Sequence, residues 1–367
     1  MPLKDYITFL NEEDKYVVLQ DTIPADSDET LGLIAGGDPE SEKIIRTLKN
    51  TLMGKSIVTF IEDRLDKAGF GKIPALVSTL SAAFNKNFNG DANDIVSISK
   101  IRNDFPISSP FTLDQVADPY KKFLHQGFFD ALYHEAAGFK MAGGAAVGKG
   151  EVYLSFLADN LYKGKVGDIQ DTSSNYEIEI KGGYGAGFGA SGGKGGSGAR
   201  MGTAEANRDG LTQFKKMLAI IAEVHELKIP IGSAWSKTQN KELGPFFNTL
   251  EGSKLLGDTK NLERFVECFT QYSVPIDSAC MSDFVPSAKS AEGLNRFMMK
   301  MQIYAYWKHS QFDGILFIDE GSKKCYPIMI KSYNDIRAAI ETGNFDKSKL
   351  EYGNSQQNSS VSITYLG

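Results

Sequence analysis

Hydrophobic residues such as Ile44, Leu48 and Leu52 recur with the spacing of one face of an α-helix through the first hundred residues. Residues that start and stop helices, such as Pro39 and Gly54, divide this pattern. The predicted helices span residues 38–54, 56–68 and 74–84. The chain therefore begins with a mainly helical accessory region, residues 1–110, which ends in a segment rich in proline and serine.

The pattern changes from helical to strand-like in the middle of the chain. Residues 118–140 and 151–162 have helical spacing, whereas 165–170 and 175–181 have strand character. The two strand segments are separated by the turn residues 171–175, so they predict a hairpin that follows a helix.

The last third of the chain adds a helix over 208–224 and strands over 315–318 and 326–330. We therefore predict an α/β domain over residues 111–350, followed by a polar, partly disordered tail over 351–367.

The predicted hairpin carries the most informative chemistry. Glu177, Glu179 and Lys181 alternate with two isoleucines, so the three polar side chains share one face of their strand. Hairpin pairing brings Asp168 toward Glu179, and two close carboxylates repel each other unless a cation lies between them. Ligands that are only carboxylate oxygens suit Mg²⁺ or Mn²⁺. A lysine beside such an ion could orient an attacking water and stabilise charge on a phosphate.

The hairpin and the helix before it combine an acid after a glycine, a Glu-x-Lys on the next strand and a glutamate on the helix. This combination resembles the PD-(D/E)xK nuclease superfamily. Asp168, Glu179, Lys181 and Glu151 occupy these positions in the order helix, strand, strand. The resemblance implies a restriction-endonuclease-like mixed sheet flanked by helices, and metal-dependent hydrolysis of DNA phosphodiester bonds. It also implies that Asp168, Glu179 and Glu151 hold Mg²⁺ or Mn²⁺ and that Lys181 positions the nucleophile. Gly167 stands where many members have proline.

Three short runs, GKGE, EIEIKGG and GARMG, also resemble uncharacterised proteins of large tailed bacteriophages. This resemblance implies a place in the host cytoplasm or the virion. It also implies a viral assembly partner or a homo-oligomer as a partner besides DNA.

Charge distribution limits where DNA could bind. The chain has a net charge of −6, so no global basic field attracts nucleic acid. Directly after the hairpin, 11 of the 21 residues from 182 to 202 are glycine, which predicts a mobile or ligand-ordered loop. Residues 181–216 contain six positive and two negative side chains. Together with Lys181, the predicted phosphate-binding residues are Lys194, Arg200, Arg208, Lys215 and Lys216.

Two alternatives come from other classes of protein. The run from Gly143 to Lys149 fits the GxxxxGK of a P-loop, and Asp319 with Glu320 follows a hydrophobic strand as in an ATPase. However, Gly150 replaces the serine or threonine that holds Mg²⁺, and the residues before the run predict a helix where a P-loop needs a strand. The other alternative is a catalytically silent DNA-binding or viral structural protein on the nuclease fold.

Composition excludes several further classes. The three cysteines are widely spaced, which argues against a disulfide framework and a structural zinc site. The N-terminal sequence lacks the pattern of a signal peptide, and no hydrophobic run has the length of a membrane span. We therefore expect a cytoplasmic protein without a membrane partner.

Overall fold

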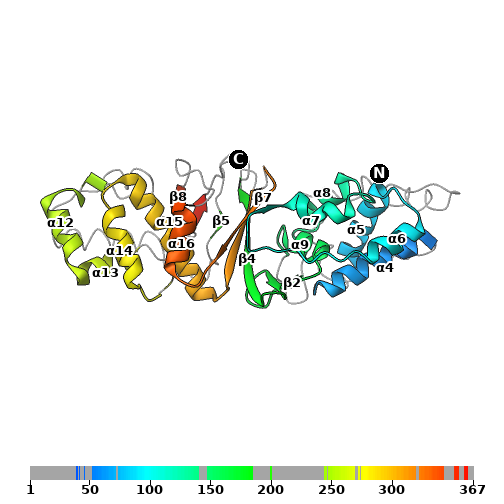
Figure 1. Ribbon diagram of the computed structural model, residues 1–367, viewed down its shortest axis with the longest axis horizontal. Coiled ribbons are helices and arrows are strands. Elements are labelled where there is room, and N and C mark those ends of the chain that lie inside the picture. The colour runs from blue at the N-terminus through cyan, green and yellow to red at the C-terminus, as the bar shows by residue number, and fades with distance from the viewer. Residues whose placement is uncertain are drawn as a thin grey trace. The chain divides into compact units, whose positions relative to one another are not determined.

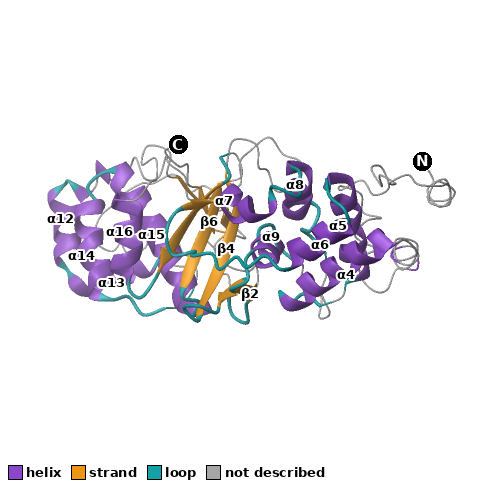
Figure 2. Cartoon of the chain, turned by 45° about the vertical axis from the view of Figure 1, so that its right-hand side comes forward, coloured by secondary structure: helices purple, strands orange, loops and turns teal. Residues whose placement is uncertain are grey.

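The computed structural model shows a mixed α/β protein (Figures 1 and 2). It describes residues 39, 41, 45, 52–71, 73–139, 147–184, 199–200, 244–245, 247–268, 272, 274–319, 322–342, 351–354 and 359–362. The chain divides into two compact units, residues 1–180 and 181–367. Within the described residues, no helix has the length and apolar character needed to cross a membrane.

Helices dominate the N-terminal unit up to Leu157. They are α4 (Leu52–Lys67), α5 (Pro74–Asn87), α6 (Ala92–Ser99), α7 (Leu113–Ala117), the 3₁₀ turn η1 (Asp118–Tyr120), α8 (Gln126–His134) and α9 (Glu151–Leu157). Local sequence sets several starts: Pro74 occupies the first turn of α5, and Asp91 forms a capping box at the start of α6.

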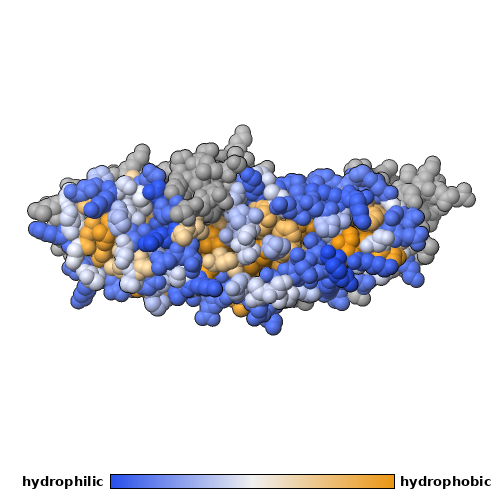
Figure 3. Space-filling view, viewed as in Figure 1, coloured by the Kyte–Doolittle hydropathy of each residue, from blue (hydrophilic) through white to orange (hydrophobic). Residues whose placement is uncertain are grey.

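Aromatic side chains form the core of these helices. Phe84 contacts Phe60 and Phe128, with ring centroids 5.5 and 5.4 Å apart, and Phe156 of α9 contacts Phe60 at 5.9 Å. Tilted and edge-to-face rings at these separations add to the stabilisation from burial. In the view of Figure 3, hydrophilic residues cover α8, and hydrophobic residues are visible over α5. Through Phe156, the helix α9 that carries Glu151 is packed into this core.

Two predicted helix limits were wrong in this unit. Gly54 does not end a helix, because it lies in the first turn of α4. The helical pattern over 118–140 breaks into η1, which has Pro119 in its first turn, a turn, and α8, which begins only at Gln126.

The N-terminal unit also contains the predicted hairpin. β2 (Leu161–Lys163) pairs antiparallel with β3 (Ile169–Asp171), and β3 pairs antiparallel with β4 (Tyr176–Tyr184), which continues into the C-terminal unit. A short strand, β1 (Phe111–Thr112), precedes α7. Two details differ from the prediction: α9 ends at Leu157, so Leu161 lies in β2, and residues 165–168 form a bend.

The C-terminal unit contains helices and a long hairpin. The helices are α12 (Leu250–Gly257), α13 (Thr259–Glu267), α14 (Ser278–Ser287), α15 (Ala291–Ser310) and α16 (Tyr333–Thr342), and the hairpin is β6 (Gly314–Asp319) with β7 (Lys324–Met329). The aromatic and methionine side chains of α15 belong to the core, because residues such as Phe297, Met299 and Tyr304 are buried.

A small antiparallel sheet joins the predicted glycine loop to the predicted tail. β5 (Ala199–Arg200) pairs with β9 (Ser359–Ser362), which pairs with β8 (Glu351–Asn354). The described residues of the predicted tail, 351–354 and 359–362, therefore form strands. The glycine loop is also shorter than predicted, because β4 continues through Gly182 and Gly183 to Tyr184.

A buried ion pair lies between helices of the C-terminal unit. Lys300 of α15 is fully buried, and its Nζ lies 2.6 Å from Oδ2 of Asp283 and 2.8 Å from Oε1 of Glu341. The hydroxyl of Tyr333 donates to the same Asp283 oxygen at 2.6 Å. Burial and the neighbouring Asp283 raise the pKa of Tyr333, so this hydroxyl stays a donor. The cluster connects α14, α15 and α16.

We expect Asp283→Ala to lower the free energy of unfolding by about 3 kcal/mol, because it removes a buried partner of a buried ammonium. Urea unfolding followed by the fluorescence of Trp307 measures the change. Glu292→Ala is the control: Glu292 pairs with Arg296 at the surface, and its loss should cost less than about 0.5 kcal/mol. Equal losses in the two variants would show that the buried cluster contributes no more than a surface pair.

Candidate functional site

Glu151 is held by a tight turn at the start of α9. It is the first residue of the helix, and its Oε1 accepts a hydrogen bond of 2.7 Å from the backbone N–H of Gly148. A side chain at Gly148 would collide with that carboxylate, and Gly150 has a φ of 87°, which favours glycine. The backbone of this turn therefore favours glycine at position 150, and Gly148 leaves room for the Glu151 carboxylate.

Asp168 lies directly before β3, opposite β4. The register pairs Ile169 with Ile178, so the next positions outward are Asp168 and Glu179. Oδ2 of Asp168 accepts a 2.7 Å hydrogen bond from the backbone N–H of Ile180, which fixes this carboxylate against β4. The predicted approach of the two strands at this point is therefore present in the structure.

Gly167 is required by the same close approach. A Cβ at this position would lie 2.7 Å from the carbonyl carbon of Ile178, closer than real side chains come. Its backbone N–H also donates to Oε2 of Glu177 at 3.3 Å, and a proline has no such donor. The departure from the proline of the nuclease motif is thus a requirement of this backbone.

Glu177 holds the bend that carries Asp168. Its Oε2 accepts from the backbone N–H groups of Lys165 at 3.0 Å, Val166 at 3.4 Å and Gly167 at 3.3 Å. A side chain at Gly164 would collide with the carbonyl of Gly167, so the bend closes tightly around the carboxylate. Glu177 thus has a structural role, although it shares a strand face with Glu179.

The three carboxylates of the sequence motif come together in the N-terminal unit. Glu151 and Glu179 are each more than nine-tenths buried, and burying a carboxylate is costly without compensation. Burial raises the pKa of Glu151 to about 8, aided by the nearby charges of Asp168 and Glu179 and by a hydrogen bond with Asp168. Glu151 therefore keeps its proton near neutral pH and donates it in a hydrogen bond to Asp168.

Lys181 lies two residues beyond Glu179 on β4, at the start of the C-terminal unit. Alternation places both residues on one face of the strand. The Nζ of Lys181 lies 3.4 Å from the hydroxyl of Tyr306 and 5.0 Å from the centre of the Tyr306 ring. The sequence predicted this lysine but gave no indication of its aromatic neighbour.

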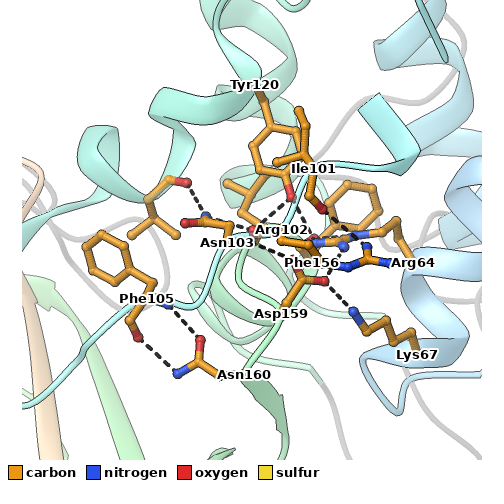
Figure 4. A network of polar contacts seen from close by, with 12 residues as sticks. Arg64, Lys67, Ile101, Arg102, Asn103, Phe105, Tyr120, Phe156, Asp159 and Asn160 are labelled. Carbon is orange, nitrogen blue, oxygen red and sulfur yellow. Dashed lines mark hydrogen bonds and ion pairs between the residues drawn. The ribbon is translucent and has the colours of Figure 1, made fainter. Parts of the chain in front are cut away.

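A polar network fixes the other end of α9 (Figure 4). Nε of Arg64 donates to the carbonyl of Phe156 at 2.8 Å, and its Nη1 lies 2.9 Å from Oδ1 of Asp159. Its Nη2 donates to the hydroxyl of Tyr120 at 3.1 Å. A cation is favourable at the C-terminal end of a helix, where unpaired carbonyl groups collect. Arg64 therefore anchors the helix that presents Glu151.

Asp171 shows how a structural acid differs from the clustered ones. It is buried at the end of β3, and its carboxylate accepts from Asn160, from the backbone of Ser173 and from the hydroxyl of Ser174. Full satisfaction by neutral donors is typical of a structural carboxylate. Glu151, by contrast, lies next to other acids.

The donor chemistry of the cluster suits a hard divalent cation, since all three side chains offer carboxylate oxygens. As the side chains lie in the structure, no group of three or more His, Cys, Asp or Glu residues within the described ranges has the arrangement of a metal site. A metal ion would compete with the proton on Glu151 for the same oxygens, because a carboxylate must lose its proton before it binds a metal.

The segments that fit a P-loop pattern form different local structures in the described residues. The helix α8 precedes Gly143, and no strand is described between residues 113 and 139. The N–H of Gly148 donates to the chain's own Glu151. Asp319 ends β6 of a hairpin, and its Oδ2 accepts from the hydroxyl of Ser322 at 2.6 Å. Asp319 therefore lies at the end of a hairpin strand, paired with Lys324.

The predicted DNA-binding residues are placed only in part. The backbone of Arg200 lies in β5, opposite Ser360. The others lie outside the described residues: Lys194, Arg208, Lys215 and Lys216. Their roles remain predictions. The same holds for the predicted helix over 208–224 and for Glu320.

Several residues that shape the site were not predicted as such. Glu177, Tyr306 and Arg64 each hold a predicted site residue or its helix. The spacing of Gly164 and Gly167 could have indicated the tight bend, whereas Arg64 is 92 residues away from Phe156 and carries no local signal. Comparison of the chain with family models, curated proteins and solved structures found no match.

We expect Gly167→Ala to displace Asp168 and destabilise the hairpin, because the new Cβ would press on the backbone of Ile178. Thermal unfolding should show a loss of about 1–3 kcal/mol. Gly257→Ala is the control, since a side chain there meets open space. A Gly167→Ala protein as stable as wild type would refute the proposed close contact.

We expect Glu151 to make stability fall as pH rises. Unfolding returns its pKa from about 8 to about 4.5, so between these values the folded chain binds an extra proton. The stabilisation is fully present below about pH 4.5 and is lost as pH rises through 8. Urea unfolding at intervals over this range should show a difference between wild type and Glu151→Gln that changes by up to about 1.4 kcal/mol per pH unit. A difference that stays constant with pH would contradict the assignment.

Proposed function

We propose that this chain is a metal-dependent nuclease of the PD-(D/E)xK type that hydrolyses DNA phosphodiester bonds. One observation carries the proposal: Glu151, Asp168 and Glu179 come from a helix, a bend and a strand and interact in one buried cluster. A buried carboxylate such as Glu151, whose pKa is raised by burial and by neighbouring acids, is a candidate for catalysis. The order of these elements is the one expected of a restriction-endonuclease-like core.

In this proposal each side chain has a distinct task. Asp168, fixed by the N–H of Ile180, and Glu179 supply the main ligand oxygens, and Glu151 contributes after it loses its proton. Lys181 donates hydrogen bonds to the attacking water or to a phosphate oxygen. The positive charge of Lys181 stabilises the negative charge that develops in the transition state.

Mg²⁺ or Mn²⁺ fits the chemistry of these carboxylates, and Asp168, Glu179 and Glu151 would hold it. Once bound, the ion would supply Lewis-acid polarisation of the phosphate and a lower pKa of a bound water. The substrate would be DNA, reached through the basic residues from Lys194 to Lys216, which carry the predicted phosphate contacts.

A plasmid-nicking assay tests the proposal. We expect wild type to nick supercoiled plasmid with Mg²⁺ or Mn²⁺ and to stop when a chelator is added. Asp168→Asn should lose both cleavage and Mn²⁺ binding in calorimetry, because it removes ligand charge. Lys181→Gln should retain Mn²⁺ binding and lose at least about a hundredfold in rate, as typical for loss of a proton-transfer or charge-stabilising group.

Asp118→Asn is the matched control, since Asp118 is an exposed aspartate that pairs with Lys121 outside the cluster. It should cleave like wild type. A wild-type chain that leaves plasmid intact with both ions would refute the nuclease proposal. Unchanged Mn²⁺ affinity in Asp168→Asn would refute the assignment of the ligands.

A further inference from the structure

We propose that Tyr306 is the positioning residue of Lys181: its ring face and hydroxyl hold the ammonium group where the reaction needs it. This inference rests on the proposed function, because it assigns a role within the same site. Tyr306 lies on α15, and it lies 125 residues from Lys181 in the sequence, so no local motif marks it.

The contact has two components. The Nζ of Lys181 lies 5.0 Å from the centre of the Tyr306 ring, within the range at which the electron-rich face attracts a cation. The same Nζ lies 3.4 Å from the Tyr306 hydroxyl, which gives the ammonium a polar partner at the ring edge. A lysine has four flexible side-chain torsions, so two simultaneous contacts restrict where its charge can lie.

The ring itself is fixed by its neighbours. Tyr306 is buried, its ring stacks on Tyr272 with centroids 6.2 Å apart, and it meets Phe312 edge-on at 5.2 Å. Tyr272 in turn stacks on His309 at 4.2 Å. Because packed rings hold one rotamer, the Tyr306 face is a rigid platform for a flexible cation.

The consequence for the site is specific. A positioning residue that acts through the lysine changes how well the lysine stabilises the transition state, and it leaves the metal ligands unchanged. Loss of Tyr306 should therefore lower kcat while the KM for DNA and the affinity for Mn²⁺ stay unchanged. A general loss of folding would change all three.

The variants Tyr306→Leu and Tyr306→Met remove the ring, and the unbranched methionine serves if leucine unfolds the chain. We expect each to lower kcat with Mg²⁺ by about three- to thirtyfold, the range that corresponds to a cation–π contact. Tyr306→Phe keeps the ring face and should restore most of the rate. Tyr304→Met is the matched control: Tyr304 is another buried tyrosine of α15, and its hydroxyl donates to the carbonyl of Pro275.

A double-mutant cycle decides whether Tyr306 acts through the lysine. In a Lys181→Met background, replacing Tyr306 by methionine should change kcat no further. An additional loss of the same size as in the wild-type background would overturn the proposal, and so would a Tyr306→Phe protein as slow as Tyr306→Met.

Lysine labelling gives a readout that does not need cleavage. In reductive methylation followed by peptide mass spectrometry, Lys181 should react several-fold faster in Tyr306→Met than in wild type or Tyr304→Met. Unchanged labelling would overturn the proposal. If wild type does not cleave DNA, the nuclease function fails, and faster labelling of Lys181 in Tyr306→Met would still establish that Tyr306 holds the lysine.

Discussion

The candidate site depends on the interaction of Arg64 with the C-terminal end of α9. A helix of only seven residues has little stability of its own, so its position must come from tertiary contacts. Arg64 satisfies the Phe156 carbonyl and is neutralised by Asp159, whose pKa falls below its ordinary value despite burial because Lys67, Asn103 and Arg64 favour the charged form. With that end fixed, Glu151 at the other end has a defined place.

Electrostatics distinguish the two units of the chain. In the C-terminal unit, buried Lys300 lies within hydrogen-bonding distance of the carboxylates of Asp283 and Glu341, so opposite charges compensate each other. In the N-terminal unit, Glu151 meets two further acids, and protonation relieves their repulsion. A buried cluster of like charges reduces the stability of the fold. Such clusters are typical of functional sites.

The sequence predicted elements whose pattern is local. Alternation identified β4, and the turn residues identified the hairpin of β3 and β4. Helix limits were less predictable, because packing decided whether Gly54 would end a helix. Spacing predicted the candidate site residues but not their supports, because Arg64 and Tyr306 lie 92 and 125 residues from their partners and only the fold brings them near.

The bend around Glu177 has a consequence for anion binding. Three backbone N–H groups in succession point at one carboxylate oxygen, which is the arrangement that loops elsewhere offer to phosphates. The protein fills this concavity with a side chain of its own, so the bend beside Asp168 keeps its shape without an external ligand. Shortening that side chain would turn a structural support into a receptor, in which a small carboxylate such as formate could restore the fold of the bend.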